Sequence, residues 1–233
     1  MYQTNLLLNY RLVPRTMFMD KQGKTLLLKT FAWSLGALVV VVAFMAWAES
    51  IRWHVFRVDS YQLFPLFGLL AFSVMWSHYI VSAVRQYLDI AKAELKNYIE
   101  ITSFLVLAAL FLHPGLLVWQ LWRDGFGLPP GSYLQNYVSP MLRWAALLGT
   151  VSLFIFFAYE LRRRYSERQW WSYVRVATDL AMIAVFVHGL KLGRNLQSGW
   201  LESVLYVYGV TLLAAMAYTY LLRLRRRQAV KSQ

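Results

Sequence analysis

The sequence TFAWSLGALVVVVAFMAWA, residues 30–48, contains no charged side chain. A helix needs about 20 consecutive apolar residues to cross the hydrocarbon core of a bilayer. Five further apolar stretches of similar length follow, at residues 60–84, 101–122, 139–159, 173–190 and 203–222. Only the fourth and fifth carry charges: Arg143, then Arg175 and Asp179. The pattern predicts an all-α integral membrane protein, built as a bundle of six transmembrane helices.

The composition agrees with a bilayer as the solvent. Of the 233 residues, 59% are hydrophobic, and none is cysteine. The lack of cysteine excludes disulfides, iron–sulfur clusters, c-type heme attachment and thiolate zinc sites. Four histidines remain as ligands for a metal or a heme. The net charge of +13 could indicate nucleic acid binding, but the basic residues lie in short segments between apolar stretches. We therefore expect a membrane environment and no nucleic acid partner.

The distribution of lysine and arginine predicts how the bundle is oriented. One alternating set of segments contains Arg11, Arg15, Lys21, Lys24, Lys29, Arg85, Lys92, Lys96, Arg162, Arg163, Arg164, Arg168, Arg223, Arg225, Arg226, Arg227 and Lys231. The opposite set contains Arg52, Arg57, Arg123, Lys191 and Arg194. By the positive-inside rule the first set faces the cytoplasm, together with both termini. The expected organisation is a cytoplasmic segment at 1–29, a membrane domain at 30–222 and a basic cytoplasmic tail at 223–233.

Two histidines fall at the same predicted depth. His113 lies 15 residues after Tyr98 and His188 lies 15 residues after Tyr173, near the inner ends of two helices that run in the same direction. Fifteen residues correspond to about 22 Å of helix. Such a pair can ligate one heme iron from opposite faces, and an apolar environment favours the neutral imidazole that does so. Two histidines that merely hydrogen-bond across the bundle are the alternative.

Short motifs around these histidines carry a resemblance to a known family. They are FGLLA at 67–71, LVLAALFLHP at 105–114, WSYVR at 171–175 and VHGLKLG at 187–193. With six spans, residues 30–222 resemble the ferric reductase-like transmembrane family. That family includes NADPH oxidases, the membrane heme subunit of the bacterial methionine sulfoxide reductase system and the STEAP metalloreductases. The resemblance implies one heme b between His113 and His188, near the outer side of a bacterial inner (plasma) membrane.

The sequence departs from the two-heme members of this family. Those members carry a second histidine pair nearer the cytoplasm, where this chain has Ile99, beside Glu100, and Arg175. The resemblance thus implies that the inner heme is absent. Arg175 then has two interpretations. It forms an ion pair with Glu100 or Asp179, or it binds the pyrophosphate of FAD, which single-heme members hold in the inner half. We favour the ion pair, because no glycine-rich phosphate loop is present.

Other polar residues have weaker assignments. Arg123, Arg143, Lys191 and Arg194 lie near the outer ends of their spans, where they would bind heme propionates or simply extend to the membrane interface. His78 is expected to be satisfied by a neighbouring backbone group or by a carboxylate, with entry of electrons or protons, or ligation of a second heme, as the less favoured alternatives. His54 is expected in an outer loop.

The function that these features predict is transmembrane electron transfer. Electrons would pass from a cytoplasmic flavin or a membrane quinol, through the outer heme, to a metal ion, oxygen or a partner protein. The sequence contains no GxGxxG motif, and 11 residues follow the sixth stretch. We therefore expect an oxidoreductase component that lacks its own dehydrogenase domain and depends on a flavoprotein reductase or quinol. The alternative is a heme-free scaffold or assembly subunit that retains the fold.

Overall fold

The computed structural model describes residues 20–56, 58–136, 138–160, 170–193 and 199–231. Within these ranges the chain is helical and contains no strand. The α-helices are α1 (Lys21–Ser50), α2 (Ser60–Tyr87), α3 (Lys96–Arg123), α4 (Gly131–Asn136), α5 (Arg143–Glu160), α7 (Trp171–Leu192) and α8 (Trp200–Lys231). Two 3₁₀ turns, η2 (Lys92–Leu95) and η3 (Pro140–Leu142), precede α3 and α5.

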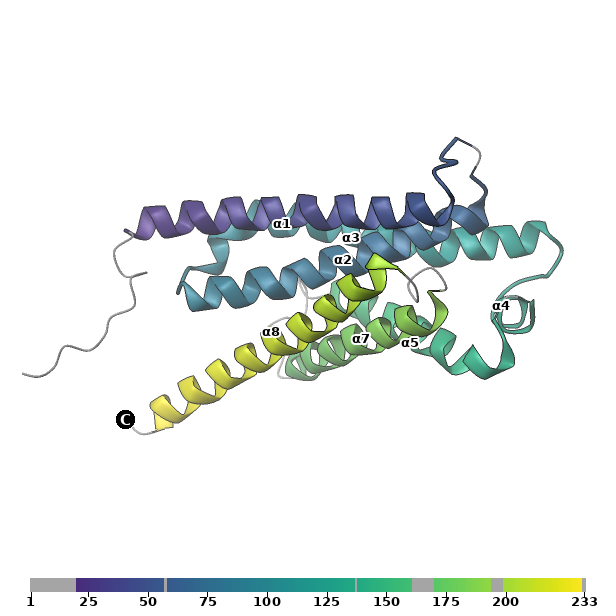
Figure 1. Cartoon of the computed structure of the whole chain (residues 1–233). Helices are drawn as coiled ribbons and strands as arrows, with labels where there is room; N and C mark the ends of the chain where they lie inside the picture. The colour runs from purple at the N-terminus through teal and green to yellow at the C-terminus, as the bar shows by residue number, and fades with distance from the viewer. Residues whose placement is uncertain (1–19, 57, 137, 161–169, 194–198, 232–233) are drawn as a thin grey trace, which may run out of the picture.

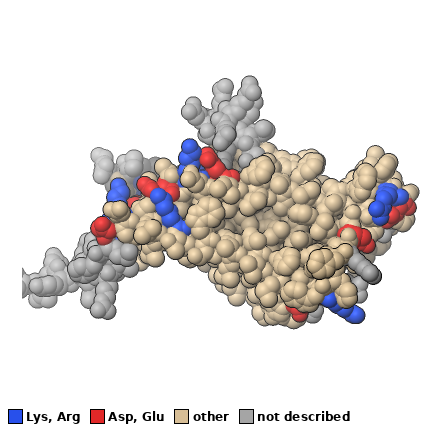
Figure 2. Space-filling view, turned by 90° about the horizontal axis from the view of Figure 1, so that it is seen from above, with Lys and Arg blue, Asp and Glu red and all other residues tan. Residues whose placement is uncertain are grey.

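Six of these helices are long and apolar enough to cross a membrane: α1, α2, α3, α5, α7 and α8. Each coincides with one of the six predicted apolar stretches, so the predicted all-α fold with six candidate spans is confirmed. Figure 2 shows charged side chains gathered toward two ends of the molecule, with a broad uncharged surface between them. The chain thus has the construction of a multi-pass membrane protein.

Acidic side chains fix where the first two helices begin. The Asp20 carboxylate accepts a hydrogen bond of 2.7 Å from the Gly23 amide at the start of α1. At the start of α2, Asp59 accepts from the Gln62 amide at 2.8 Å, and the Gln62 side chain accepts from the Asp59 amide at 3.4 Å. This reciprocal capping box satisfies amide groups that have no partner within the helix.

The helices form two groups that face each other. Helix α2 packs against α1, α3 and α8, whereas α5 packs against α7. Figure 1 shows α1, α2 and α3 lying side by side, with α5 and α7 as a second antiparallel pair. The beginning of α1 and the end of α8 lie at the same end of the bundle, here called the terminal end. An even number of spans requires this arrangement; that the terminal end faces the cytoplasm remains a prediction.

A tryptophan of α2, Trp76, connects this helix to α8. The indole nitrogen of Trp76 donates to the Tyr208 carbonyl at 3.0 Å and to the Thr211 hydroxyl at 3.1 Å. The Trp76 ring also stacks on the Tyr208 ring, with centroids 4.2 Å apart. Because no water competes for these groups inside a bilayer, the pair fixes how α8 lies against α2.

Trp76→Phe is expected to destabilise the bundle by about 0.6–1.7 kcal/mol, the usual range for an interhelical hydrogen bond in a membrane. The substitution keeps an aromatic ring against Tyr208 and removes the indole N–H. Unfolding free energy in mixed detergent micelles measures the effect. Trp119→Phe is the matched control, since Trp119 is 54% exposed. Equal stability of the two variants would contradict the assignment.

Candidate functional site

The structure brings the two predicted histidines together between the helix groups. His113 and His188 each lie 17 residues after the first residue of their helices, Lys96 of α3 and Trp171 of α7. Their ring centres are 6.4 Å apart and the ring planes are nearly perpendicular, at 84°. The equal depth expected from the sequence therefore corresponds to a close pair of imidazoles.

Both imidazoles are held by a backbone carbonyl of a neighbouring helix. His113 Nδ1 lies 2.9 Å from the Phe64 carbonyl oxygen of α2, and His188 Nδ1 lies 2.8 Å from the Ala145 carbonyl oxygen of α5. A carbonyl oxygen can only accept, so Nδ1 is the protonated, donating nitrogen in each ring. In the neutral ring, Nε2 is then the nitrogen with the free lone pair. In metal-binding histidines, the ring nitrogen that does not bind the metal commonly donates to a carbonyl or carboxylate in the same way.

A glycine makes room for each ring. Gly68 and Gly149 lie four residues after Phe64 and Ala145, so in an α-helix their amides bond to the same two carbonyls. A Cβ atom added at Gly68 would lie 2.8 Å from the His113 ring, and one at Gly149 would lie 2.5 Å from the His188 ring. Both distances are too short for any side chain. Each imidazole thus lies directly on the bare backbone of the adjacent helix.

The same unit therefore occurs twice, once in the α2–α3 hairpin and once in the α5–α7 hairpin. In each, a carbonyl and the glycine four residues later, within FPLFG (64–68) or AALLG (145–149), receive a histidine from the following helix. The sequence interpretation included Gly68 within a family motif but missed Gly149 and both carbonyls. The available signal was the shared glycine position in two otherwise apolar stretches.

The pair has the spacing of two axial ligands. Imidazoles that bind one metal from opposite sides have ring centres about 6–6.5 Å apart, because each nitrogen lies about 2.0–2.1 Å from the metal. The observed 6.4 Å falls in this range. Among the described residues, no group of three or more His, Asp or Glu side chains could hold a bare metal ion. Two neutral imidazoles suit a heme, because the macrocycle supplies the remaining four ligands.

The basic residues predicted near the outer side occupy helix ends. Arg143 is the first residue of α5 and lies two residues before Ala145. Its Nε donates to the Leu134 carbonyl at 3.0 Å. Arg123 is the last residue of α3. Lys191 lies three residues after His188 in the last turn of α7. Arg194 lies outside the described residues. Binding of propionates by these residues stays a prediction.

Arg175 does not lie with the histidines, and its expected ion pair is wrong. It is 13 residues before His188, about 20 Å along α7. In the described part of the chain it forms no salt bridge with Asp179 or Glu100. The Asp179 carboxylate instead accepts from the hydroxyls of Tyr79, at 2.9 Å, and Tyr220, at 2.7 Å. Two phenols from α2 and α8 therefore take the place of the guanidinium.

The other two histidines are placed apart from the pair. His78 Nε2 lies 2.6 Å from the Thr102 hydroxyl oxygen, and Thr102 donates its single proton to the Tyr98 carbonyl at 2.6 Å. His78 must then donate from Nε2, which is the opposite tautomer to the paired histidines. A neighbouring group does satisfy His78, but this partner is a hydroxyl and not the expected backbone group or carboxylate. His54 lies exposed in the loop between α1 and α2.

Comparison with protein-family models, with curated proteins and with solved structures found no match for this chain. What the structure itself shows, over the described residues, is an all-helical protein with six candidate membrane spans and a close pair of imidazoles. The resemblance to the ferric reductase-like family stays a prediction that rests on the motifs quoted above.

Gly68→Ala and Gly149→Ala are each expected to destabilise the protein by about 1–3 kcal/mol, the usual cost of forcing extra volume into a packed interior. The new methyl group would displace the imidazole from its carbonyl. Gly115→Ala is the matched control on α3, because a Cβ there meets nothing within 4 Å. That control is expected to be neutral or stabilising by about 0.5–1 kcal/mol. Unfolding in detergent distinguishes the three variants, and equal behaviour would refute the close approach.

Proposed function

We propose that this protein transfers electrons across a membrane through one b-type heme held between His113 and His188. The observation that carries the proposal is that both rings make the same kind of hydrogen bond. Each has Nδ1 donating to a carbonyl, which leaves Nε2 for the metal, at a ring spacing of 6.4 Å. A pair that served only to hold helices together would not need the same tautomer on both sides.

The chain's own residues would set the properties of such a site. The Phe64 and Ala145 carbonyls orient the rings and make each imidazole a more basic ligand. Gly68 and Gly149 keep the rings close to the helix backbones. When bound, the heme supplies reversible one-electron chemistry. Arg143, Arg123, Lys191 and Arg194 are the candidates to bind its propionates with charge-assisted hydrogen bonds.

The direction of transfer follows from the charge distribution. The positive-inside rule assigns the terminal end to the cytoplasm, so the paired histidines would lie toward the outer face. A cytoplasmic flavin, such as FAD on a reductase partner, or a membrane quinol would donate the electrons. A metal ion, oxygen or a partner protein would accept them outside. Membership of the ferric reductase-like family and location in a bacterial plasma membrane belong to the same proposal.

The visible spectrum of the purified protein is the direct test. We expect a reduced-minus-oxidised difference with the Soret and alpha bands of a b-type heme. His113→Ala and His188→Ala are expected to abolish it, because each removes one axial ligand. Added imidazole should partly restore the bands in a variant that remains folded, because it can occupy the space of the missing ring. A colourless but folded wild-type protein would contradict the proposal and favour a scaffold or assembly role.

The heme content should be one per chain. His78→Ala is the control for the histidine variants, because His78 uses Nε2 to bond Thr102. We expect this variant to retain the full heme content by pyridine hemochrome assay. A ratio near two in the wild-type protein, reduced to one by His78→Ala, would instead show a second heme in the inner half.

A further inference from the structure

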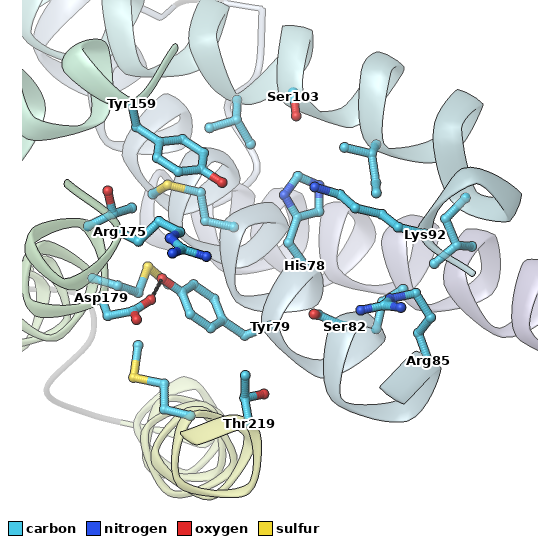
Figure 3. A pocket seen from close by; sticks show the side chains of 18 of the residues that line it. His78, Tyr79, Ser82, Arg85, Lys92, Ser103, Tyr159, Arg175, Asp179 and Thr219 are labelled. Carbon is cyan, nitrogen blue, oxygen red and sulfur yellow. Dashed lines mark hydrogen bonds between the residues drawn. The ribbon is translucent and has the colours of Figure 1, made fainter. Parts of the chain in front are cut away.

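A separate cavity of about 500 Å³ lies toward the terminal end of the bundle, where α2 and α8 end and α3 and α7 begin. Residues of α2, η2, α3, α5, α7 and α8 line it, and neither His113 nor His188 does. Figure 3 shows Arg175 reaching into it from α7 and Lys92 reaching into it from the opposite side. The cavity is therefore distinct from the paired-histidine site.

The charges around the cavity do not balance. Among the residues that the structure describes, five cationic side chains line it: Arg85, Lys92, Arg175, Arg223 and Arg226. Its lining includes one carboxylate, Asp179, and the hydroxyls of Tyr79 and Tyr220 already bond to both oxygens of that group. Uncompensated charge in a partly dehydrated space is unfavourable. The cavity thus has an excess of positive charge that an anion would offset.

Some of these cations have partners and others do not. Arg85 donates to the Ile90 carbonyl at 2.8 Å, Arg226 lies 3.8 Å from Asp89, and Arg223 lies over the Tyr220 ring. Within the described residues, neither Lys92 nor Arg175 forms a hydrogen bond or an ion pair. Both side chains are exposed, and both point into the space of the cavity (Figure 3), where one anion can contact the two of them.

The lining changes character with depth. The cations come from the helix ends: the last turn of α2, η2, the beginning of α7 and the end of α8. Farther from these ends the lining includes apolar side chains such as Met75 of α2, Leu110 of α3 and Met182 of α7. A ligand that fits both parts has an anionic head and an apolar body.

We propose that this cavity binds the head group of an anionic phospholipid, with Arg175 and Lys92 contacting the phosphate oxygens. Arginine suits this role because its planar guanidinium can form two parallel hydrogen bonds to a phosphate. Phosphate also carries enough acceptor oxygens to engage several cations at once. A phospholipid combines this phosphate with apolar chains that fit the apolar part of the lining. The inference rests on the cavity and its charges and does not depend on heme.

Binding to delipidated full-length protein in neutral detergent tests the proposal. Two probe pairs differ in the phosphate: dioleoylphosphatidylglycerol against dioleoylglycerol, and riboflavin 5′-phosphate against riboflavin. We expect the phosphatidylglycerol to bind better than dioleoylglycerol and better than riboflavin 5′-phosphate. Arg175→Gln should weaken that binding about tenfold, the effect of losing one charge-assisted hydrogen bond. Arg175→Lys should fall between, because it keeps the charge and loses the planar donor pair.

Arg225→Gln is the matched control, because Arg225 is exposed on α8 and does not line the cavity. Lys92→Gln repeats the test from the opposite wall, should Arg175→Gln not fold. The proposal is overturned if phosphatidylglycerol binds no better than dioleoylglycerol, or if riboflavin 5′-phosphate binds better than the lipid. It is also overturned if the cavity variants bind as well as Arg225→Gln.

Discussion

The hydrogen bond from an imidazole Nδ1 to a helix carbonyl is the interaction on which the candidate site depends. In both hairpins that carbonyl also accepts the helical hydrogen bond donated by the amide of a glycine four residues later. A carbonyl has two lone pairs, so it can accept from the helix and from the histidine together. The second bond is reachable only where no Cβ covers the carbonyl, which explains Gly68 and Gly149. Backbone geometry, rather than other side chains, thus fixes which nitrogen of each ring is left for a metal.

The bilayer explains why such hydrogen bonds form between the helices and hold the site in place. Polar groups in the spans cannot turn to water, so they find partners on other helices. Trp76 reaches α8, and Asp179 of α7 receives phenols from α2 and α8. Each bond is of modest strength on its own. Together they determine how the helices lie, and hence the distance between His113 and His188.

The sequence predicted the spans and the depth of the histidine pair because both depend on local quantities. A run of apolar residues such as 30–48 is sufficient to indicate a spanning helix, and the rise per residue converts position into height. The partners of the rings could not be predicted in the same way. A backbone carbonyl leaves no residue-specific mark, and Phe64 lies 49 residues from the histidine that it binds.

Asp179 shows where a local rule gives the wrong answer. Arg175 is four residues earlier, the spacing at which opposite charges meet on a helix. Yet tyrosines that lie 100 and 41 residues away in sequence bind the carboxylate in the folded protein. Both phenols donate at short range without bringing a second charge into the span. Tertiary contacts therefore decided the pairing, and they left the guanidinium directed into the cavity.

The separation of Arg175 from the histidines bears on how the two sites could influence each other. Thirteen residues of helix place them about 20 Å apart. At that distance, with an effective dielectric constant near 20, one unit charge changes the energy of another by about 0.8 kcal/mol. Water in the open cavity would reduce this figure. If a heme is bound as proposed, an excess of cations at the terminal end would favour an electron at the histidine site, and an anion bound in the cavity would offset part of that effect. The two sites can communicate through charge alone, without a contact between them.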